Sequence, residues 1–170
     1  MPARRPPSDG DLEYAARRLG RALVQRRWQM ASAESCTGGL LGHVITGVPK
    51  ASDHYLGGVI SYSNLLKEQL LGVDHDLLER VGAVSPEVAE AMADGILRQF
   101  AVAHLAVSVT GIAGPDGGSA DKPVGLVYVA VALRDGPARI ERAVWTHDRE
   151  GNKRASALLA LEMAHAMATE

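Results

Sequence analysis

Short apolar segments typical of β-strands alternate along this chain with segments of helical periodicity, and that order constrains the fold more than any other feature. Strands are predicted at residues 28–33, 56–63 and 104–110, and two further runs at residues 126–133 and 139–146 are typical of a hairpin. Strands interleaved with helices favour parallel pairing, whereas a hairpin is antiparallel. The sequence therefore predicts an α/β fold, a single three-layer αβα domain with a largely parallel sheet and a C-terminal antiparallel hairpin.

Helices are indicated by apolar residues that recur with the helical period and by residues that favour helix starts. At residues 11–27 the apolar residues form one stripe and five arginines lie on the other faces. A solvated helix face is a commoner explanation for such arginines than a phosphate-binding surface. Ser85 before Pro86 is typical of a helix start, and Asn64 and Asp148 are expected to cap two others. The remaining helices are expected at residues 39–45, 74–80 and 85–100.

Length and composition limit the number of domains and the kinds of partner. A chain of 170 residues suits one domain, which we expect at residues 11–170 behind a Pro-rich, disordered tail at residues 1–10. The formal net charge of −2 gives no electrostatic case for nucleic acid as a partner. A single cysteine excludes an internal disulfide, and no apolar run approaches the ~18 residues of a membrane span. We therefore expect a soluble, cytoplasmic protein without a membrane or nucleic-acid partner.

Three polar segments follow the ends of the first three predicted strands, at residues 35–39, 62–67 and 110–118. In open α/β sheets ligands bind at the carboxyl ends of the strands, so these segments predict the site. The sequence ASAESCTGGLL at residues 31–41 is typical of a strand that turns sharply into a helix, whose start suits an anion or a developing oxyanion. Thr37 and the two glycines could equally serve only to cap that helix.

Ser35 is a candidate nucleophile, but it needs a base to take its proton. No histidine lies in the strand-end segments, so the candidate base is Lys67, whose pKa burial would lower. Its burial is expected among neighbouring leucines, and a surface lysine beside Glu68 is the alternative. The leucines are Leu65, Leu66, Leu70 and Leu71.

Two neighbouring residues compete for roles in this chemistry. Cys36 is a second candidate nucleophile, but adjacent side chains point apart and a lone buried cysteine is usually inert, so Ser35 is favoured. Tyr62 either relays a proton or orients the pair, or is an interior tyrosine that only satisfies its own hydroxyl. The histidines show no paired ligand spacing, so we expect no metal and no cofactor.

Four segments in the same order resemble the CinA C-terminal domain family, and the match runs from about residue 20 to the end of the chain. They are AESCTGG at residues 33–39, GGVISYSNLLKEQLLGV at 57–73, GAVSPEVAEAMADG at 82–95, and VTGIAGPDGGSADKPVGLVYVAVA from residue 109. The resemblance implies a nicotinamide mononucleotide deamidase, which hydrolyses the amide to nicotinate mononucleotide and ammonia without a metal, in pyridine nucleotide salvage. It also implies the stand-alone form, without the molybdopterin-binding-like domain of larger CinA proteins.

The resemblance assigns Ser35 as nucleophile, Lys67 as base and Tyr62 as the accompanying tyrosine. The substrate-binding residues it implies are Ser52, Thr110, Gly111 and Arg149, and the strand-to-helix turn adds Thr37 and Gly38 as candidates. Ser52 is the only serine left of a Gly-Ser-Ser segment, and Arg149 survives from a Phe-Pro-Gly-Asp-Arg run as a candidate phosphate contact. We expect nicotinamide mononucleotide as substrate and a homo-oligomer of unspecified order. The alternatives are a non-catalytic nucleotide-binding or interaction module related to competence and recombination proteins, and an amidase for another nucleotide amide.

Overall fold

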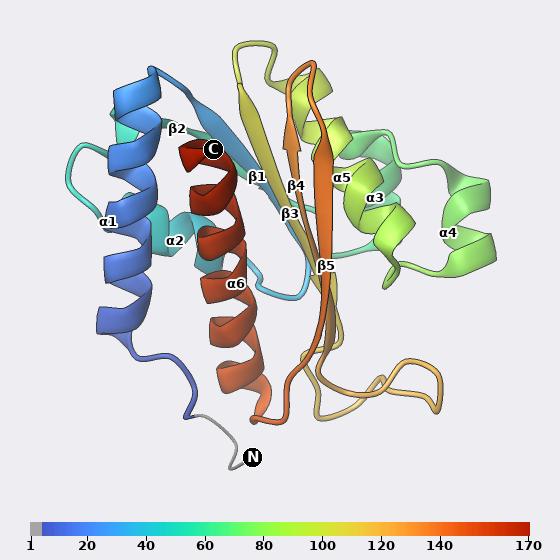
Figure 1. Cartoon of the computed structure of the whole chain (residues 1–170). Coiled ribbons are helices and arrows are strands. Elements are labelled where there is room, and N and C mark those ends of the chain that lie inside the picture. The colour runs from blue at the N-terminus through green and yellow to red at the C-terminus, as the bar shows by residue number, and fades with distance from the viewer. Residues whose placement is uncertain (1–4) are drawn as a thin grey trace.

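Five strands form one mixed sheet in the computed structural model, which describes residues 5–170 (Figure 1). The strands are β1 (Met30–Glu34), β2 (Tyr55–Ile60), β3 (Leu105–Gly111), β4 (Leu126–Leu133) and β5 (Ala138–Val144). Their spatial order is β2-β1-β3-β4-β5. β1 pairs in parallel with both β2 and β3, while β4 pairs antiparallel with β3 and β5. The predicted parallel core and C-terminal hairpin are confirmed.

The helices cover both faces of the sheet and make the predicted three layers (Figure 1). They are α1 (Asp9–Arg26), α2 (Leu40–Thr46), α3 (Asn64–Leu71), α4 (His75–Val81), α5 (Pro86–Gln99) and α6 (Arg149–Thr169), with a short 3₁₀ helix η1 (Ala51–Asp53). α1, α2 and α6 pack together on one face, and α3, α4 and α5 on the other. Among residues 5–170, no helix has both the length and the apolar character that crossing a membrane requires.

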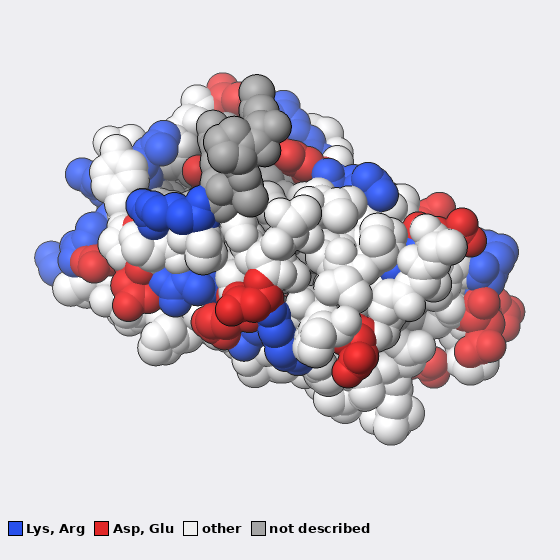
Figure 2. All heavy atoms as spheres, turned by 90° about the horizontal axis from the view of Figure 1, so that it is seen from below, with Lys and Arg blue, Asp and Glu red and all other residues white. Residues whose placement is uncertain are grey.

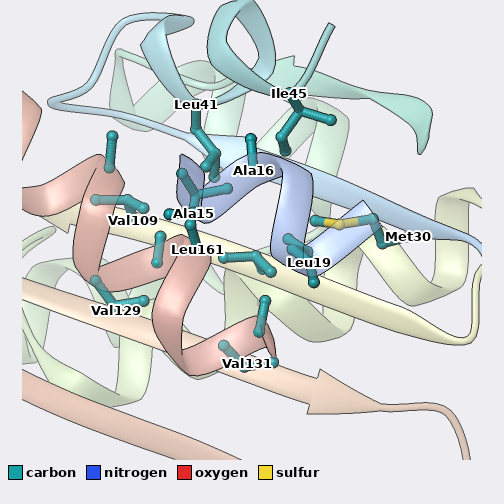
Figure 3. Close-up of a cluster of buried hydrophobic side chains, with 14 of the residues drawn as sticks. Ala15, Ala16, Leu19, Met30, Leu41, Ile45, Val109, Val129, Val131 and Leu161 are labelled. Atoms are coloured by element: carbon teal, nitrogen blue, oxygen red, sulfur yellow. The ribbon is translucent and has the colours of Figure 1, made fainter. Parts of the chain in front are cut away.

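Two apolar clusters hold these layers together. In the first, Leu19 of α1, Leu41 of α2 and Leu161 of α6 meet Met30 and Val109 of the sheet (Figure 3). In the second, the buried face of α5 packs on small alanines of β1, β3 and β4. Both clusters bury apolar side chains at helical spacing against side chains of alternate strand positions, which is the arrangement that the sequence pattern predicts.

The start of α1 differs from its predicted position because a side chain just before it provides the cap. α1 begins at Asp9 rather than at residue 11, because the Ser8 side chain caps the helix and the Asp11 carboxylate in turn accepts a hydrogen bond from the Ser8 N–H. Part of the expected tail thus belongs to the helix start, and Arg154 also binds the Pro7 carbonyl at 2.6 Å. Residues 1–4 of that tail lie outside the described residues.

The caps of the later helices follow the same chemistry. Ser63, not Asn64, caps α3, since its hydroxyl accepts from the Leu66 N–H at 3.3 Å. The predicted caps at Ser85 and Asp148 are confirmed, with their oxygens accepting from Val88 and Gly151. Because α6 starts where β5 has returned, its first residues lie at the edge where the parallel strands end.

Candidate active site

A pocket of about 260 Å³ lies at the edge where β1, β2 and β3 end. It is lined by residues of all three strand ends, the α5 start, the loop after β3 and the α6 start. The lining residues are Ser35, Cys36, Tyr62, Lys67, Ala83, Val84, Thr110, Gly111, Ile112, Ala113, Gly114, Asp116, Gly117 and Arg149. Figure 2 views the molecule from the side of these strand ends, where acidic and basic side chains are interspersed among large uncharged areas. The pocket lies where the topology predicts a ligand.

Ser35 and Lys67 form a buried pair at this edge. Nζ of Lys67 lies 3.0 Å from Oγ of Ser35 and also donates to the carbonyl oxygens of Ser61 at 2.7 Å and Tyr62 at 3.4 Å. Ser35 follows β1 directly, whereas Lys67 lies on the first turn of α3 and reaches back under the end of β2. The side chain of Lys67 is only 1% exposed, so the alternative of a surface lysine beside Glu68 is wrong.

Burial lowers the pKa of Lys67 to about 8, from an ordinary value of 10.5. The carbonyl oxygens of Ser61 and Tyr62 accept hydrogen bonds from the ammonium. With a pKa of about 8, a minor fraction of the amine is neutral at pH 7 and can accept a proton. The expected leucine cage is only partly present, since Leu65 and Leu70 are 58% and 41% exposed. The low pKa therefore comes from tertiary packing at the strand ends rather than from the neighbouring leucines of α3.

Cys36 also lines the pocket but lacks the character of a nucleophile. Its side chain is buried, and burial raises the pKa of its thiol to about 12. A thiol needs a lowered pKa to react as the thiolate, so this environment favours Ser35. The backbone N–H of Cys36 has no acceptor among residues 5–170, and it lies beside the Ser35 hydroxyl in the chain.

Glu34 occupies the helix start that the sequence suggested for a bound anion. Its carboxylate accepts from the N–H groups of Gly39 at 3.0 Å, Leu41 at 3.0 Å and Gly42 at 2.8 Å. The carboxylate is 3% exposed, and it satisfies the unpaired donors of the first turn of α2. The start of α2 is therefore capped internally by this chain and does not serve an external anion, which corrects the expectation.

Tyr62 and Arg149 meet at the mouth of the pocket although 87 positions separate them. The guanidinium of Arg149 donates to the Tyr62 hydroxyl at 3.2 Å and to the Gly114 carbonyl at 2.7 Å. Tyr62 is 59% exposed, so the alternative of an interior tyrosine is wrong. These bonds fix a cation at the rim of the pocket, between the end of β2 and the loop after β3.

Of the six expected binding residues, Thr110, Gly111 and Arg149 line the pocket, and the other three do not. The Thr110 hydroxyl donates to the Ala83 carbonyl at 2.8 Å, which leaves its lone pairs able to accept. Thr37 is fully buried, with no partner for its hydroxyl within the described part of the chain, and Gly38 forms the turn at φ 61°. Ser52 is exposed in η1, and it belongs to the segment before β2 rather than to a strand end.

Asp116 is a pocket residue that the sequence reasoning passed over. Its side chain adds a carboxylate to the pocket lining. Its position in the Gly- and Pro-rich loop after the third strand is the feature of the sequence that could have indicated this role. Glu34 was also missed as a cap, although an acidic residue just before a Gly-Gly helix start is a recognisable sign of one. In residues 5–170, no three His, Cys, Asp or Glu side chains gather as metal ligands would.

The fold and the pocket define a three-layer α/β protein with a buried serine–lysine pair at the carboxyl edge of its sheet. The chain belongs to the CinA family, because the model of the CinA C-terminal domain matches residues 12–168. It is 44% identical over 146 residues to the nicotinamide-nucleotide amidohydrolase PncC of Enterobacter agglomerans, covering 86% of this chain and 88% of that one. Family membership and the expected fold are thereby confirmed.

Other relatives are longer or structurally characterised. A CinA-like protein of Acidobacterium capsulatum is 49% identical over 141 residues, which are 83% of this chain and 34% of that one. The chain thus spans about a third of the length of several relatives. The crystal structure of the competence/damage inducible protein CihA from Agrobacterium tumefaciens matches with a TM-score of 0.90 and 40% identity, covering 93% of this chain and 96% of that one.

Proposed function

We propose that this protein hydrolyses the carboxamide of nicotinamide mononucleotide to nicotinate mononucleotide and ammonia, as a step of pyridine nucleotide salvage. The observation that carries the proposal is the 3.0 Å contact between the Ser35 hydroxyl and a lysine that is 1% exposed and has a lowered pKa. The relative named nicotinamide-nucleotide amidohydrolase, which matches this chain over most of both lengths, supports the choice of substrate.

In the first half of the proposed reaction Ser35 attacks the amide. The neutral amine of Lys67 takes the proton from Oγ as Oγ bonds to the carbonyl carbon, and the carbonyl π electrons move onto oxygen. The Cys36 N–H, which has no acceptor within residues 5–170, is suited to donate to that oxyanion. Meanwhile the new ammonium is held by the carbonyls of Ser61 and Tyr62.

In the second half the same lysine acts as an acid and then again as a base. Lys67 gives its proton to the amide nitrogen as the C–N bond breaks, so ammonia leaves and an ester on Ser35 remains. A water molecule then loses a proton to Lys67 and attacks the ester, and Oγ takes that proton back as nicotinate mononucleotide departs. The amine of Lys67 serves all four proton transfers, because it takes up and releases a proton in turn. A pKa near the working pH keeps both the neutral and the protonated amine accessible.

The remaining lining residues suit the polar groups of the nucleotide. Arg149 is a cation at the rim, where a charge-assisted hydrogen bond to the 5′-phosphate would contribute about 1.5 to 3 kcal/mol. Thr110 has free lone pairs toward the amide N–H₂, and the exposed carboxylate of Asp116 suits the ribose hydroxyls as an acceptor. The starts of α2 and α6 are capped by Glu34 and Asp148, which leaves Arg149 as the phosphate contact.

The test is to incubate the purified protein with nicotinamide mononucleotide and to measure ammonia and nicotinate mononucleotide in equal amounts. Activity should persist after exhaustive chelation, because Ser35 and Lys67 supply both nucleophile and base. Ser35→Ala, which removes one oxygen, is the control for contaminating amidases. Binding of the nucleotide without ammonia release would favour the non-catalytic alternative. Faster release from another nucleotide amide would identify a different substrate and keep the mechanism.

A further inference from the structure

A second and larger pocket lies at the opposite edge of the sheet. It has a volume of about 490 Å³, within the range of about 300–1,000 Å³ of small-molecule sites. It is formed by the C-terminal half of α1, the turn after α2 and the residues that lead into β2. The lining residues are Arg17, Gly20, Arg21, Val24, Gln25, Val48, Pro49, Lys50, Asp53 and His54. It shares none of them with the catalytic pocket.

Its place in the fold separates it from the catalytic pocket. The carbonyl of His54 accepts from the Met30 N–H at 2.8 Å, so His54 lies where β1 and β2 begin. The catalytic pocket lies where these strands end. In Figure 1 the C-terminal half of α1 is at the top and the loop that lines the catalytic pocket is at the bottom. A ligand at one pocket therefore does not contact a ligand at the other.

His54 is a buried polar side chain in this lining that lacks a partner. The residue is 4% exposed, and its Nδ1 makes no hydrogen bond to any of residues 5–170. Gly20 lets the ring approach α1 closely, since a Cβ there would lie 2.8 Å from Cε1 of His54. A glycine inside a helix and an unpaired buried polar atom each lower the stability of the folded state. Burial lowers the pKa of His54, and the nearby carboxylate of Asp53 opposes this only in part. The neutral ring offers one donor and one acceptor.

The charges around the ring favour an anion. Three basic residues line the pocket against a single carboxylate, that of Asp53. Arg17 is held by Glu13 on the next turn of α1, at 2.6 Å. Arg21 and Lys50 form no ion pair with any residue from 5 to 170, and both are exposed toward solvent. Two cations are thus available where α1 meets Lys50, the residue just before η1.

The rest of the wall is apolar. Val24 of α1 is 50% exposed and Pro49 is also exposed, whereas Val48 lines the pocket as a buried residue of the core. The combination matches a ligand that carries both a phosphate and a flat or apolar group.

We propose that this pocket binds a phosphate monoester with an aromatic or apolar portion, of the size of a nucleoside monophosphate. Arg21 and Lys50 bind the phosphate oxygens by charge-assisted hydrogen bonds, and the ring system packs on Val24, Val48 and Pro49. His54, packed against Gly20, forms part of the pocket wall and reports on its occupancy. The binding site is separate from the catalytic pocket, so both are occupied at once.

The test uses adenosine 5′-monophosphate as the probe, in calorimetric titrations of the full chain. Inorganic phosphate and adenosine are titrated as comparisons, and we expect each to bind at least about tenfold more weakly, because each lacks half of the contacts. The ¹³Cε1 resonance of His54, assigned by its absence in His54→Gln, reports occupancy of this pocket specifically. It should shift with the same midpoint as the calorimetric curve.

The double variant Arg21→Gln with Lys50→Gln should weaken binding of the probe at least about tenfold. Arg18→Gln is the matched control, since Arg18 lies on the same helix beside Tyr14 and His165 and outside the pocket; it should change affinity less than about twofold. Equal weakening by both would mean general attraction to a basic helix face and would overturn the proposal. So would a His54 resonance that does not move, or binding lost only in Arg149→Gln, which would place the probe in the catalytic pocket.

Discussion

The two pockets of this molecule place their cations in opposite ways. In the catalytic pocket Lys67 is 1% exposed, and the oxygens of Ser35, Ser61 and Tyr62 surround its Nζ. In the pocket beside α1, Lys50 is exposed and has no ion-pair partner within residues 5–170. Burial lowers the proton affinity of an amine, whereas an exposed amine without a partner is accessible to an anion. The first arrangement suits proton transfer, and the second suits the binding of an anion.

The two pockets also differ in whether their buried polar side chains have hydrogen-bond partners. Around Lys67 each N–H of the ammonium has an oxygen within 3.4 Å, so the buried ammonium has a complete set of hydrogen-bond acceptors. At the other pocket the only buried polar group of the lining, His54, has an unpaired ring nitrogen. A satisfied set of hydrogen bonds holds a side chain in place for chemistry, whereas a buried nitrogen without a partner destabilises the folded state.

The largest effect should come from breaking the Ser35–Lys67 pair. Groups that act as a unit lose nearly all activity at the first substitution, so Ser35→Ala, Lys67→Ala and the double variant should each lose on the order of 10³-fold or more in kcat. Lys67→Arg should be as inactive, because it keeps the charge and removes the base. Steady-state ammonia release measures this. A multiplied loss in the double variant, or an inactive Cys36→Ala in a folded protein, would show that the pair is wrongly assigned.

The pH profile should separate the buried amine from ordinary side chains. Only the neutral amine of Lys67 can take the serine proton, so kcat/KM should rise about tenfold per pH unit below pH 8 and level off above it. The profile is measured in the wild type over a range in which the circular dichroism spectrum is constant. A limb centred near the ordinary pKa of histidine, about 6.5, would instead point to one of the histidines.

A smaller effect is expected at the rim of the catalytic pocket. Arg149→Gln should lower kcat/KM for nicotinamide mononucleotide by about 10- to 100-fold, because one charge-assisted contact to the phosphate is lost. Turnover of the dephosphorylated riboside should be low in the wild type and unchanged by the substitution. Arg80→Gln, on the last turn of α4, is the control. Equal losses for nucleotide and riboside would assign Arg149 to holding the loop through Gly114 rather than to the phosphate.

The smallest effect concerns stability and compares the two lysines directly. Lys67→Met should raise the free energy of unfolding at pH 7 by about 1–3 kcal/mol, because it removes a buried charge. Lys50→Met should change it by less than about 0.5 kcal/mol. The pKa of Lys67 is about 8 in the folded protein and about 10.5 in the unfolded chain, so between these pH values the unfolded chain binds more protons. The free energy of unfolding of the wild type therefore rises over this range. The difference in unfolding free energy between Lys67→Met and the wild type becomes smaller. Urea denaturation at both ends of this range tests the sign, and a widening gap would contradict it.

Local sequence patterns were sufficient for the order and type of the elements. The helical stripe at residues 11–27, the Ser85-Pro86 start and the hairpin after residue 126 all appear as predicted, because periodicity and capping act within one or two turns. Because ligands bind at the carboxyl ends of the strands in open α/β sheets, the sequence also predicts that residues after β1, β2 and β3 share one site. Ser35 and Lys67 could be paired on that basis, with the family resemblance assigning the same two residues.

Tertiary structure decided the environment of those residues, which local patterns do not encode. The leucines next to Lys67 are partly exposed, and its low pKa depends on the register that places the ends of β1 and β2 over α3. The carboxylate of Glu34 accepts from the N–H groups at the start of α2, which the sequence suggested for an anion. Arg149 donates to Tyr62 because β5 returns the chain to the edge of the sheet where α6 starts. The pocket beside α1 likewise joins segments that are distant in the chain. Burial and charge pairing depend on distances between such segments, and only packing of the whole chain sets those distances.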